Sequence, residues 1–279
     1  MIIPVILCGG AGARLWPASR DDTPKPFLPL VGGRSTFAMT LERIADEAYF
    51  APPVIVAAAV HRHLVEAALA AAGVTNVTLL LEPEPRDTAA AVGAAAALVA
   101  DAAPDATVLL LPADQVIRDV ALFREAVVAS EASAINGRIV IFGTRPDHPA
   151  TGFGYIKPGR ALMGTTVRSV EAFVEKPDAL RASDFVAQGY LWNGGIFMMR
   201  AATALSELRA HAPDIARGVR EAVARSTATG NVVTLPGDIF HMIPKLSFDH
   251  AVMEKTDRAA VAEARFEWSD VGTWASVWQ

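Results

Sequence analysis

Short runs of β-branched and aliphatic residues alternate with longer alanine- and leucine-rich segments through the first half of the chain. This alternation is typical of a parallel sheet whose strands are connected by crossover helices. The short runs predict strands at residues 2–7, 53–57, 77–81, 107–111 and 138–142. The longer segments predict helices at residues 36–49, 62–72, 88–103 and 121–136. Ser35, Asp87 and Asp119 each precede one of these helices and are expected to cap it.

The pattern changes in the second half of the chain. It predicts, in order, extended segments at 153–157 and 166–174, a helix at 179–188 and a strand at 195–200. Asp178 is the expected cap of that helix. The extended segments indicate an insertion that adds antiparallel strands to the sheet. Because no internal repeat or long Gly/Ser linker interrupts the chain, we predict a single α/β domain over residues 1–279, with a Rossmann-like mixed, mostly parallel sheet flanked by helices.

Composition narrows the function classes. The chain has 279 residues, 52% of them apolar and 20% charged, the balance of a globular protein with an ample core. Its formal net charge of −5 argues against a general nucleic-acid surface, so an anionic ligand needs a local basic pocket. The single cysteine, Cys8, excludes a disulfide framework, and the six histidines do not cluster at metal-ligand spacing.

Targeting signals are not evident in the sequence. The N-terminus lacks the basic start and long apolar run of a signal peptide. The most apolar stretch, residues 89–103, is shorter than the roughly twenty apolar residues that span a bilayer. We therefore expect a cytoplasmic protein that binds neither a membrane nor nucleic acid.

A glycine-rich loop follows the first predicted strand, where open α/β sheets bind ligands. Residues 8–17 read Cys-Gly-Gly-Ala-Gly-Ala-Arg-Leu-Trp-Pro. The glycines let backbone N–H groups approach phosphate oxygens, while Arg14 and Lys25 add positive charge. A Walker loop is absent, and a dinucleotide fingerprint fails because Leu15 stands where its third glycine belongs. On its residues alone, the segment is either a phosphate loop or an ordinary turn.

Two aspartates lie just after predicted strands. Asp114 ends a Leu-Pro-Ala-Asp segment, and Asp270 lies in Trp-Ser-Asp-Val-Gly. Alone, each is more typical of a turn or cap. Beside a polyphosphate loop, such a pair suits Mg²⁺, which prefers carboxylates together with phosphate oxygens.

Further polar residues suit a sugar phosphate. Glu175 and Lys176 are adjacent at a strand end, where their side chains are expected to point to opposite faces rather than to pair. Asn193 offers a donor and an acceptor to a sugar hydroxyl, although Asn-Gly alone favours a turn. Asp249 orients either a sugar group or Lys176, and a helix cap is an equally good interpretation.

The segment Pro-Arg-Asp-Thr-Ala at residues 85–89 bears on base recognition. Guanine presents N1–H and an exocyclic amine, which are donors that suit a carboxylate. Asp87 fits that role, but we give slightly more weight to its role as a helix cap.

Residues 9–17 and the Pro-Lys-Pro-Phe of residues 24–27 resemble the signature of nucleoside-diphosphate-sugar pyrophosphorylases. The Leu-Trp-Pro at residues 15–17 is similar to the mannose-1-phosphate guanylyltransferase branch. The resemblance runs from residue 3 to residue 278, with five motif blocks in the expected order. It implies a GT-A-like nucleotide-diphospho-sugar transferase fold, with residues 1–150 binding the nucleotide and residues 151–279 binding the sugar phosphate.

The resemblance also implies roles for individual residues. Catalytic roles fall to Arg14, Lys25 and Lys176. Nucleotide binding falls to Cys8, Gly9, Gly10, Gly12, Arg14, Arg86, Asp87 and Thr88. Sugar binding falls to Gly154, Glu175, Lys176, Asn193 and Asp249. Metal binding, with Mg²⁺ as the cofactor, falls to Asp114 and Asp270.

The implied reaction converts GTP and mannose 1-phosphate into GDP-mannose and pyrophosphate. Alternatives are glucose 1-phosphate with UTP, dTTP or ATP, or a catalytically silent nucleotide-sugar-binding subunit. The sequence departs from the family at Gln115, where His is usual, and at Gly194, where Ser is usual. Family members commonly continue into a small β-helix, which we expect this chain to lack, and a homodimer is left open.

Overall fold

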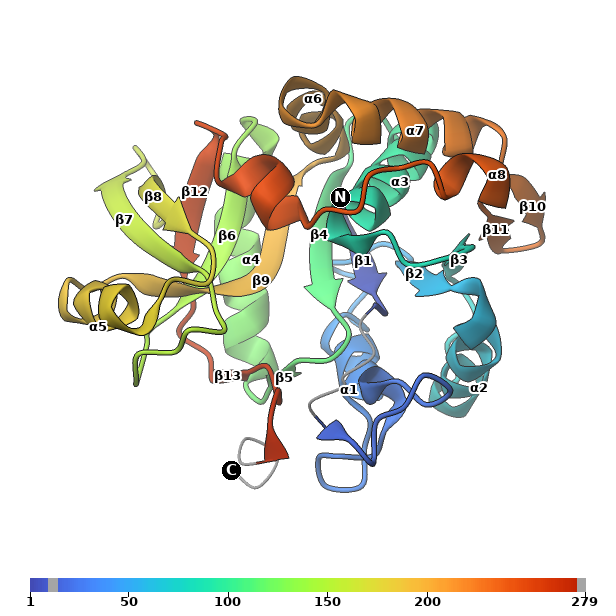
Figure 1. Cartoon of the computed structure of the whole chain (residues 1–279), viewed down its shortest axis with the longest axis horizontal. Helices are drawn as coiled ribbons and strands as arrows, with labels where there is room; N and C mark the ends of the chain where they lie inside the picture. Colours follow the sequence, from blue (N-terminus) through green and yellow to red (C-terminus); the bar gives the residue numbers. More distant parts are fainter. Residues whose placement is uncertain (10–14, 275–279) are drawn as a thin grey trace.

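The computed structural model describes residues 1–9 and 15–274. Within this part of the chain, one eleven-stranded sheet runs through the molecule (Figure 1). Its strands are β1 (Ile2–Leu7), β2 (Val54–Ala58), β3 (Thr78–Glu82), β4 (Thr107–Pro112), β6 (Ile139–Thr144), β7 (Tyr155–Ala161), β8 (Arg168–Val174), β9 (Leu191–Arg200), β10 (Thr227–Thr229), β11 (Val232–Thr234) and β12 (Ala259–Glu263). In space they follow the order β10-β11-β3-β2-β1-β4-β9-β6-β12-β8-β7.

The α/β class and the mixed, mostly parallel sheet are confirmed. Of the eleven strands that form this sheet in the described part of the chain, β8, β9 and β10 run opposite to the other eight. The five strands predicted in the first half lie within two residues of their predicted bounds. The strand predicted at 195–200 begins earlier, at Leu191, because it crosses the molecule between β4 and β6 and pairs with both.

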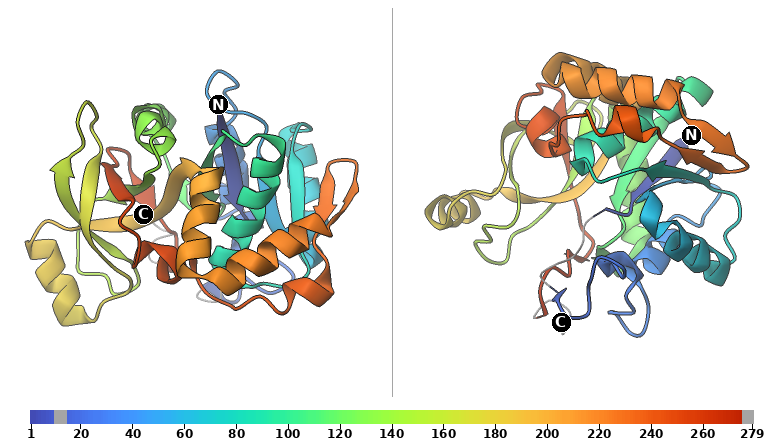
Figure 2. Two further views of the ribbon diagram at one scale, coloured as in Figure 1. Left: turned by 90° about the horizontal axis from the view of Figure 1, so that it is seen from above. Right: turned by 45° about the vertical axis from the view of Figure 1, so that its right-hand side comes forward.

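Helices cover both faces of the sheet (Figure 2). They are α1 (Thr36–Arg43), α2 (Arg62–Ala72), α3 (Asp87–Ala102), α4 (Val120–Ile135), α5 (Ala179–Ala187), α6 (Ala201–His211), α7 (Pro213–Ala224) and α8 (Gly237–Phe240). Neighbouring residues of a strand point to opposite faces of the sheet, each with its own hydrophobic core. In β1, Val5 belongs to the core that contains the alanines of α3, and Ile6 belongs to the core that contains Phe37 of α1 and Phe123 of α4. Side chains alternate along a strand, so a strand covered on both faces reads as a continuous apolar run.

The alanine-rich helix α3 owes its composition to close packing. It contacts both α6 and α7, two helices that the sequence pattern did not single out. A Cβ added at Gly93 would lie 3.0 Å from side-chain atoms of both Leu208 and Val219. Small side chains on α3 therefore let two helices approach it, which explains why it is buried on almost every side.

Helix boundaries follow their caps, with two exceptions. The side chains of Ser35, Asp119 and Asp178 accept hydrogen bonds from backbone N–H groups in the first turns of α1, α4 and α5, as predicted. The prediction for α1 was too long: the helix ends at Arg43 because the Asp46 side chain accepts from Ala48 N, at 3.1 Å, and forms a local turn instead.

Asp87 is the second exception. It lies inside α3 with a positive φ of 63°, and its carboxylate accepts from the adjacent Thr88 N at 2.8 Å. The next N–H of the helix, that of Ala89, donates to the carbonyl of Leu246 at 3.1 Å. A distant segment therefore satisfies that donor, and the predicted capping bond of Asp87 is not formed.

A small two-stranded sheet, β5 (Val116–Ile117) with β13 (Trp268–Ser269), lies at the carboxyl edge of the large sheet. Trp268 pairs with Ile117, and Ser269 pairs with Val116. This pairing brings Asp114 and Asp270, which are distant in sequence, to the same corner. Among the described residues, no helix is long and apolar enough to cross a membrane.

Candidate functional site

Lys25 is the centre of one half of the site, which we call the phosphate corner (Lys25, Asp114 and Asp270). It opens a short 3₁₀ helix, Lys25–Phe27, and its side chain is 6% exposed. Its Nζ donates to Asp114 Oδ2 at 2.7 Å and also to the backbone carbonyl of Asp270. The structure thus brings together three residues that the sequence predicted to act together.

The phosphate corner has a donor set that fits Mg²⁺. Asp114 is 35% exposed and follows the buried strand β4, while the Asp270 carboxylate accepts from Gly272 N at 3.0 Å. Among the described residues, no group of three or more His, Cys, Asp and Glu is placed to hold a metal ion. Mg²⁺ is commonly bound by one or two carboxylates with substrate phosphates and water supplying the rest, so two aspartates suffice.

The start of the glycine-rich loop borders this corner. Cys8 is buried, and its backbone N donates to Val56 O at 2.8 Å. Burial, together with the nearby charge of Asp114, raises the pKa of the Cys8 thiol well above its usual range, so the thiol stays protonated. Gly9 is exposed, and the space where a Cβ would point is open. Gly10, Gly12 and Arg14 lie outside the described residues.

Four predicted sugar-binding residues form a second group, the sugar cluster (Gly154, Glu175, Asn193 and Asp249, with Lys176 beside them). Asn193 Nδ2 donates to Asp249 Oδ1 at 2.8 Å, and Asn193 N donates to Gly154 O at 2.7 Å. A Cβ added at Gly154 would lie 2.5 Å from Glu175 Oε2, so this position requires glycine. That oxygen is buried and has no hydrogen-bond partner among the described residues.

Lys176 contradicts the expectation that it points away from Glu175. Its Nζ donates to Glu175 Oε1 at 2.6 Å. The reason is local: β8 has ended at Val174 and Lys176 has a φ of 45°, so the alternation of an ideal strand no longer applies. Partial burial opposes the charge, but the bond to Glu175 and the charges of Glu175, Asp249 and Asp87 outweigh it and raise the pKa of Lys176.

Asp249 is the carboxyl group of the sugar cluster with the most altered acidity. Burial, and then the charge of Glu175, raise the pKa of Asp249 to about 6, against the opposing effects of Asn193 and Lys176. It opens a single π-helical turn, Asp249–Met253, and is not a helix N-cap. Its carboxylate is directed to Asn193, so the capping alternative for Asp249 is wrong.

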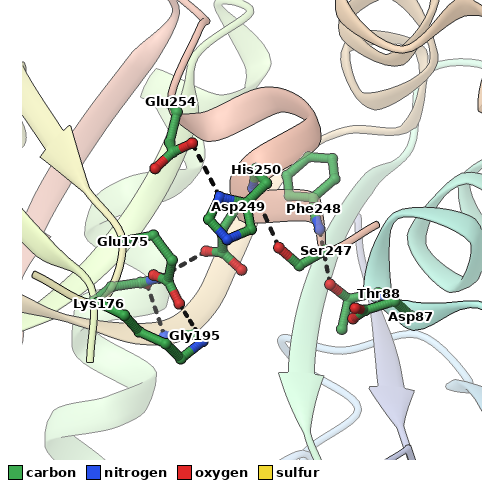
Figure 3. Close-up of polar contacts among 11 residues, drawn as sticks. Asp87, Thr88, Glu175, Lys176, Gly195, Ser247, Phe248, Asp249, His250 and Glu254 are labelled. Carbon is green, nitrogen blue, oxygen red and sulfur yellow. Dashed lines mark hydrogen bonds and ion pairs between the residues drawn. The ribbon is translucent and has the colours of Figure 1, made fainter. Parts of the chain in front are cut away.

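The start of α3 faces the sugar cluster across the site. Figure 3 shows Asp87 and Thr88 on one side, Glu175 and Lys176 on the other, and the segment around Asp249 between them. Thr88 Oγ1 accepts from Phe248 N at 2.8 Å, which ties the two sides together. Arg86 donates to Glu84 Oε1 from Nε and Nη2, at 3.1 and 2.5 Å, which holds its guanidinium beside this segment.

Three buried polar residues were given no role by the sequence. Glu82, at the end of β3, is 8% exposed, and burial raises its pKa to about 8. Gln115 is 6% exposed and donates from Nε2 to Gly194 O at 2.7 Å. Arg43 is 1% exposed and donates from Nη2 to Gln115 O at 3.3 Å. Glu82 gave a usable signal, an acid ending an apolar run, but nothing in the sequence marks the partners of Arg43.

The glycines after Asn193 are required by close backbone approach. A Cβ added at Gly194 would lie 2.6 Å from the carbonyl oxygen of Phe142, so this backbone has no room for the serine that is usual in the family. Gly195 has a φ of +68°, and a Cβ there would lie 3.2 Å from Gln115 Nε2. Gly195 N donates to Asn193 Oδ1 at 2.9 Å, which fixes the amide of Asn193.

The fold and the site define the class to which the protein belongs. Over residues 3–279 the sequence matches the nucleotidyl transferase family, and the chain belongs to that family. A mannose-1-phosphate guanylyltransferase of Sinorhizobium fredii is 42% identical over 280 residues, an alignment that covers 100% of this chain and 54% of that protein. The chain thus spans about half the length of this curated relative.

Solved structures show the same fold. The mannose-1-phosphate geranyltransferase of Thermus thermophilus, as that protein is called, superposes with a TM-score of 0.87 at 34% identity, over 100% of this chain and 79% of that one. A mannose-6-phosphate isomerase of Helicobacter pylori superposes with a TM-score of 0.81 at 26% identity, over 96% of this chain and 99% of that one. The nucleotide-diphospho-sugar transferase fold is thereby confirmed.

Proposed function

We propose that this chain transfers the guanylyl group of GTP to mannose 1-phosphate, giving GDP-mannose and pyrophosphate. The observation that carries the proposal is that the phosphate corner and the sugar cluster lie on either side of one site. Lys25 is held between Asp114 and the Asp270 segment, and the sugar cluster lies toward the other half of the sheet. The similarity to a mannose-1-phosphate guanylyltransferase over the whole of this chain supports the choice of sugar and base.

The proposed reaction needs positioning and charge neutralisation rather than a general base. A phosphate oxygen of mannose 1-phosphate, already an anion, attacks the α-phosphorus of GTP in line. As the new P–O bond forms, the bond from the α-phosphorus to the bridging oxygen of the β-phosphate breaks, and pyrophosphate departs with that oxygen. Lys25 and Arg14 bind the nucleotide phosphates, and Lys176 neutralises the sugar phosphate. Lys25 is well suited to this, because its carboxylate and carbonyl contacts fix its ammonium group in a buried position.

Mg²⁺ is the proposed cofactor, held by Asp114 and Asp270. When bound, it neutralises charge on the phosphate oxygens. The roles of the two carboxylates can be tested by replacing each with the neutral amide of similar shape, Asp114→Asn and Asp270→Asn. Titration of each variant with Mg²⁺ should then give much weaker binding of Mg²⁺-GTP. Binding of the same strength as in the parent chain would remove that carboxylate from the metal site.

Asp87 is the residue that we assign to the base. It is exposed at the start of α3 and offers an acceptor to guanine N1–H and the exocyclic amine. Asp87→Asn should change the preference for GTP over ATP, and an unchanged preference would move base recognition elsewhere.

One experiment separates the proposal from its alternatives. Release of pyrophosphate is measured with Mg²⁺ for GTP, UTP, dTTP and ATP, each with mannose 1-phosphate and with glucose 1-phosphate. The highest kcat/KM is expected for GTP with mannose 1-phosphate. A higher value for another pair would reassign the substrates within the family, and no release with any pair would favour a silent binding subunit.

A further inference from the structure

Arg43 is a charged residue at a buried position that would suit an apolar side chain. It is the last residue of α1, it is 1% exposed, and its guanidinium lies 5.4 Å from the centre of the Phe123 ring. Its Nη2 donates to the backbone carbonyl of Gln115 at 3.3 Å. Among the described residues, its Nε and Nη1 have no hydrogen-bond partner.

Such a placement is costly, because buried donors and charges lose their hydration. Burial lowers the pKa of Arg43 to about 10, so the guanidinium still carries its charge at neutral pH. A leucine or methionine would fill much of the same space without that cost. The contact that only the arginine makes is the one to the carbonyl of Gln115, the residue directly after Asp114.

Gln115 extends this contact to the sugar cluster. Its side chain is buried, and its Nε2 donates to Gly194 O at 2.7 Å. The amide orientation is fixed, because a carbonyl oxygen can only accept and the nitrogen must therefore face Gly194. Gly194 in turn lies between Asn193 and Gly195, whose backbone N donates to the Asn193 side chain.

The backbone at Gly194 and Gly195 is tightly packed and has little room to shift. The carbonyl of Phe142 would lie 2.6 Å from a Cβ at Gly194, and Gln115 Nε2 would lie 3.2 Å from a Cβ at Gly195. A shift of the Gln115 side chain must therefore move the Asn193 segment or break its hydrogen bond. Small displacements at a reacting centre have large effects on rate, so a rigid connection here matters for positioning.

We propose that Arg43 and Gln115 are positioning residues that form a buried brace between the phosphate corner and the sugar cluster. Arg43 holds the main chain beside Asp114, and Gln115 ties that main chain to the Asn193 segment. The brace thereby sets the distance between the phosphates held at Lys25 and the sugar held at Asn193. This inference rests on the proposed function for its consequences in catalysis, but the brace itself is a property of the free protein.

The first test needs no substrate and no metal. Backbone amide hydrogen exchange is measured on the full metal-free chain for the parent, Gln115→Leu and Arg43→Met. Loss of one hydrogen bond of ordinary strength should speed exchange about tenfold in peptides that cover residues 113–117 and 192–196. The matched control is Ser130→Ala, which removes a buried side-chain bond to Ala126 O in α4 and should leave both segments unchanged.

The second test asks whether the brace positions substrate. In Gln115→Leu the KM for mannose 1-phosphate should rise about tenfold while the KM for GTP stays unchanged. A rise confined to the KM for mannose 1-phosphate is not predicted by a merely structural role, which would change both constants.

The outcomes of these tests distinguish the brace from the proposed function. Equal rises in KM for both substrates, or faster exchange everywhere in the chain, would show that Arg43 and Gln115 only stabilise the fold, and would overturn the brace. If exchange in the variants is faster only in the two segments, the brace is retained. If the parent chain also releases no pyrophosphate, the proposed function is overturned while the brace still stands. Unchanged exchange in both segments would overturn the brace whatever the activity.

Discussion

The phosphate corner and the sugar cluster use charge in opposite ways. In the corner, a buried lysine is flanked by a half-exposed carboxylate and a backbone carbonyl, so a positive group is fixed where phosphates are expected. In the cluster, Glu175 and Asp249 lie close enough for the charge of one to raise the pKa of the other. The corner suits a ligand of high negative charge, whereas the cluster suits neutral hydroxyl groups that need donors and acceptors in fixed directions.

The two regions also differ in how the fold builds them. The corner is assembled at the carboxyl ends of β4 and β13, far apart in the sequence, by the pairing of β13 with β5. The cluster gathers residues from β9, from the turn after β8 and from the π-helical turn. Under the proposed function, the corner fixes where the reaction occurs and the cluster fixes which sugar is held there.

The largest expected effect is the loss of Lys25. Lys25→Ala removes the fixed positive charge of the corner, so kcat/KM for pyrophosphate release should fall by about 10²–10³-fold. Lys245→Ala, which removes an exposed lysine outside the site, is the matched control and should keep the parent activity. Comparable turnover in Lys25→Ala and the control would remove Lys25 from the catalytic machinery.

A smaller effect, confined to the sugar, is expected from the cluster. Asn193→Ala removes the donor to Asp249 and the acceptor from Gly195 N, and should raise the KM for mannose 1-phosphate about tenfold. The KM for GTP should stay close to that of the parent chain, which initial rates at varied GTP will show. If the KM values for both substrates rose together, the two regions would not bind their substrates independently.

The acidity of Asp249 predicts a pH effect specific to the cluster. Its folded pKa of about 6 exceeds the value of about 3.9 expected when the chain is unfolded, so folding binds this proton more tightly. Its contribution to stability is therefore complete below the unfolded pKa and is lost as the pH rises through about 6.

Urea unfolding of the parent and of Asp249→Asn at a series of pH values tests this effect. The difference in unfolding free energy between the two chains should change across this window and be constant above it. Asp184→Asn, at an exposed position on α5, is the control. A difference that does not vary with pH would mean that Asp249 is not held in the way the structure indicates.

The smallest effect is expected from the helix caps next to each region. Ser35→Ala removes the cap of α1, which carries Arg43, and Asp178→Ala removes the cap of α5, which follows the Glu175 turn. Each should lower the free energy of unfolding by about 1 kcal/mol. Because neither cap touches the site, both variants should keep the parent ratio of the KM for mannose 1-phosphate to the KM for GTP. A changed ratio would mean that the regions depend on their helices more than the hydrogen bonds imply.

Much of the first half of the fold was predictable because its signals are local. Strands buried on both faces form continuous apolar runs, and Ser35 and Asp119 mark helix starts through bonds that span only three residues. The same logic failed at Asp87, because a carbonyl from Leu246 satisfies the donor that a cap would have served. It also failed at Lys176, where a positive φ brings the side chain back to Glu175.

The amino-acid sequence indicated which residues could carry the proposed chemistry. The basic glycine-rich loop, the aspartates at strand ends and the adjacent Glu175 and Lys176 are legible because each is a residue type in a local context. Which of these residues meet one another depends on the tertiary fold. Lys25 with Asp114, Asn193 with Asp249, and Arg43 with Gln115 are contacts across 89, 56 and 72 positions, and no local periodicity records them. Lys25, Arg43 and Asp249 lie on helical segments, so each contact forms only when such a segment packs against a strand or the residues that follow it.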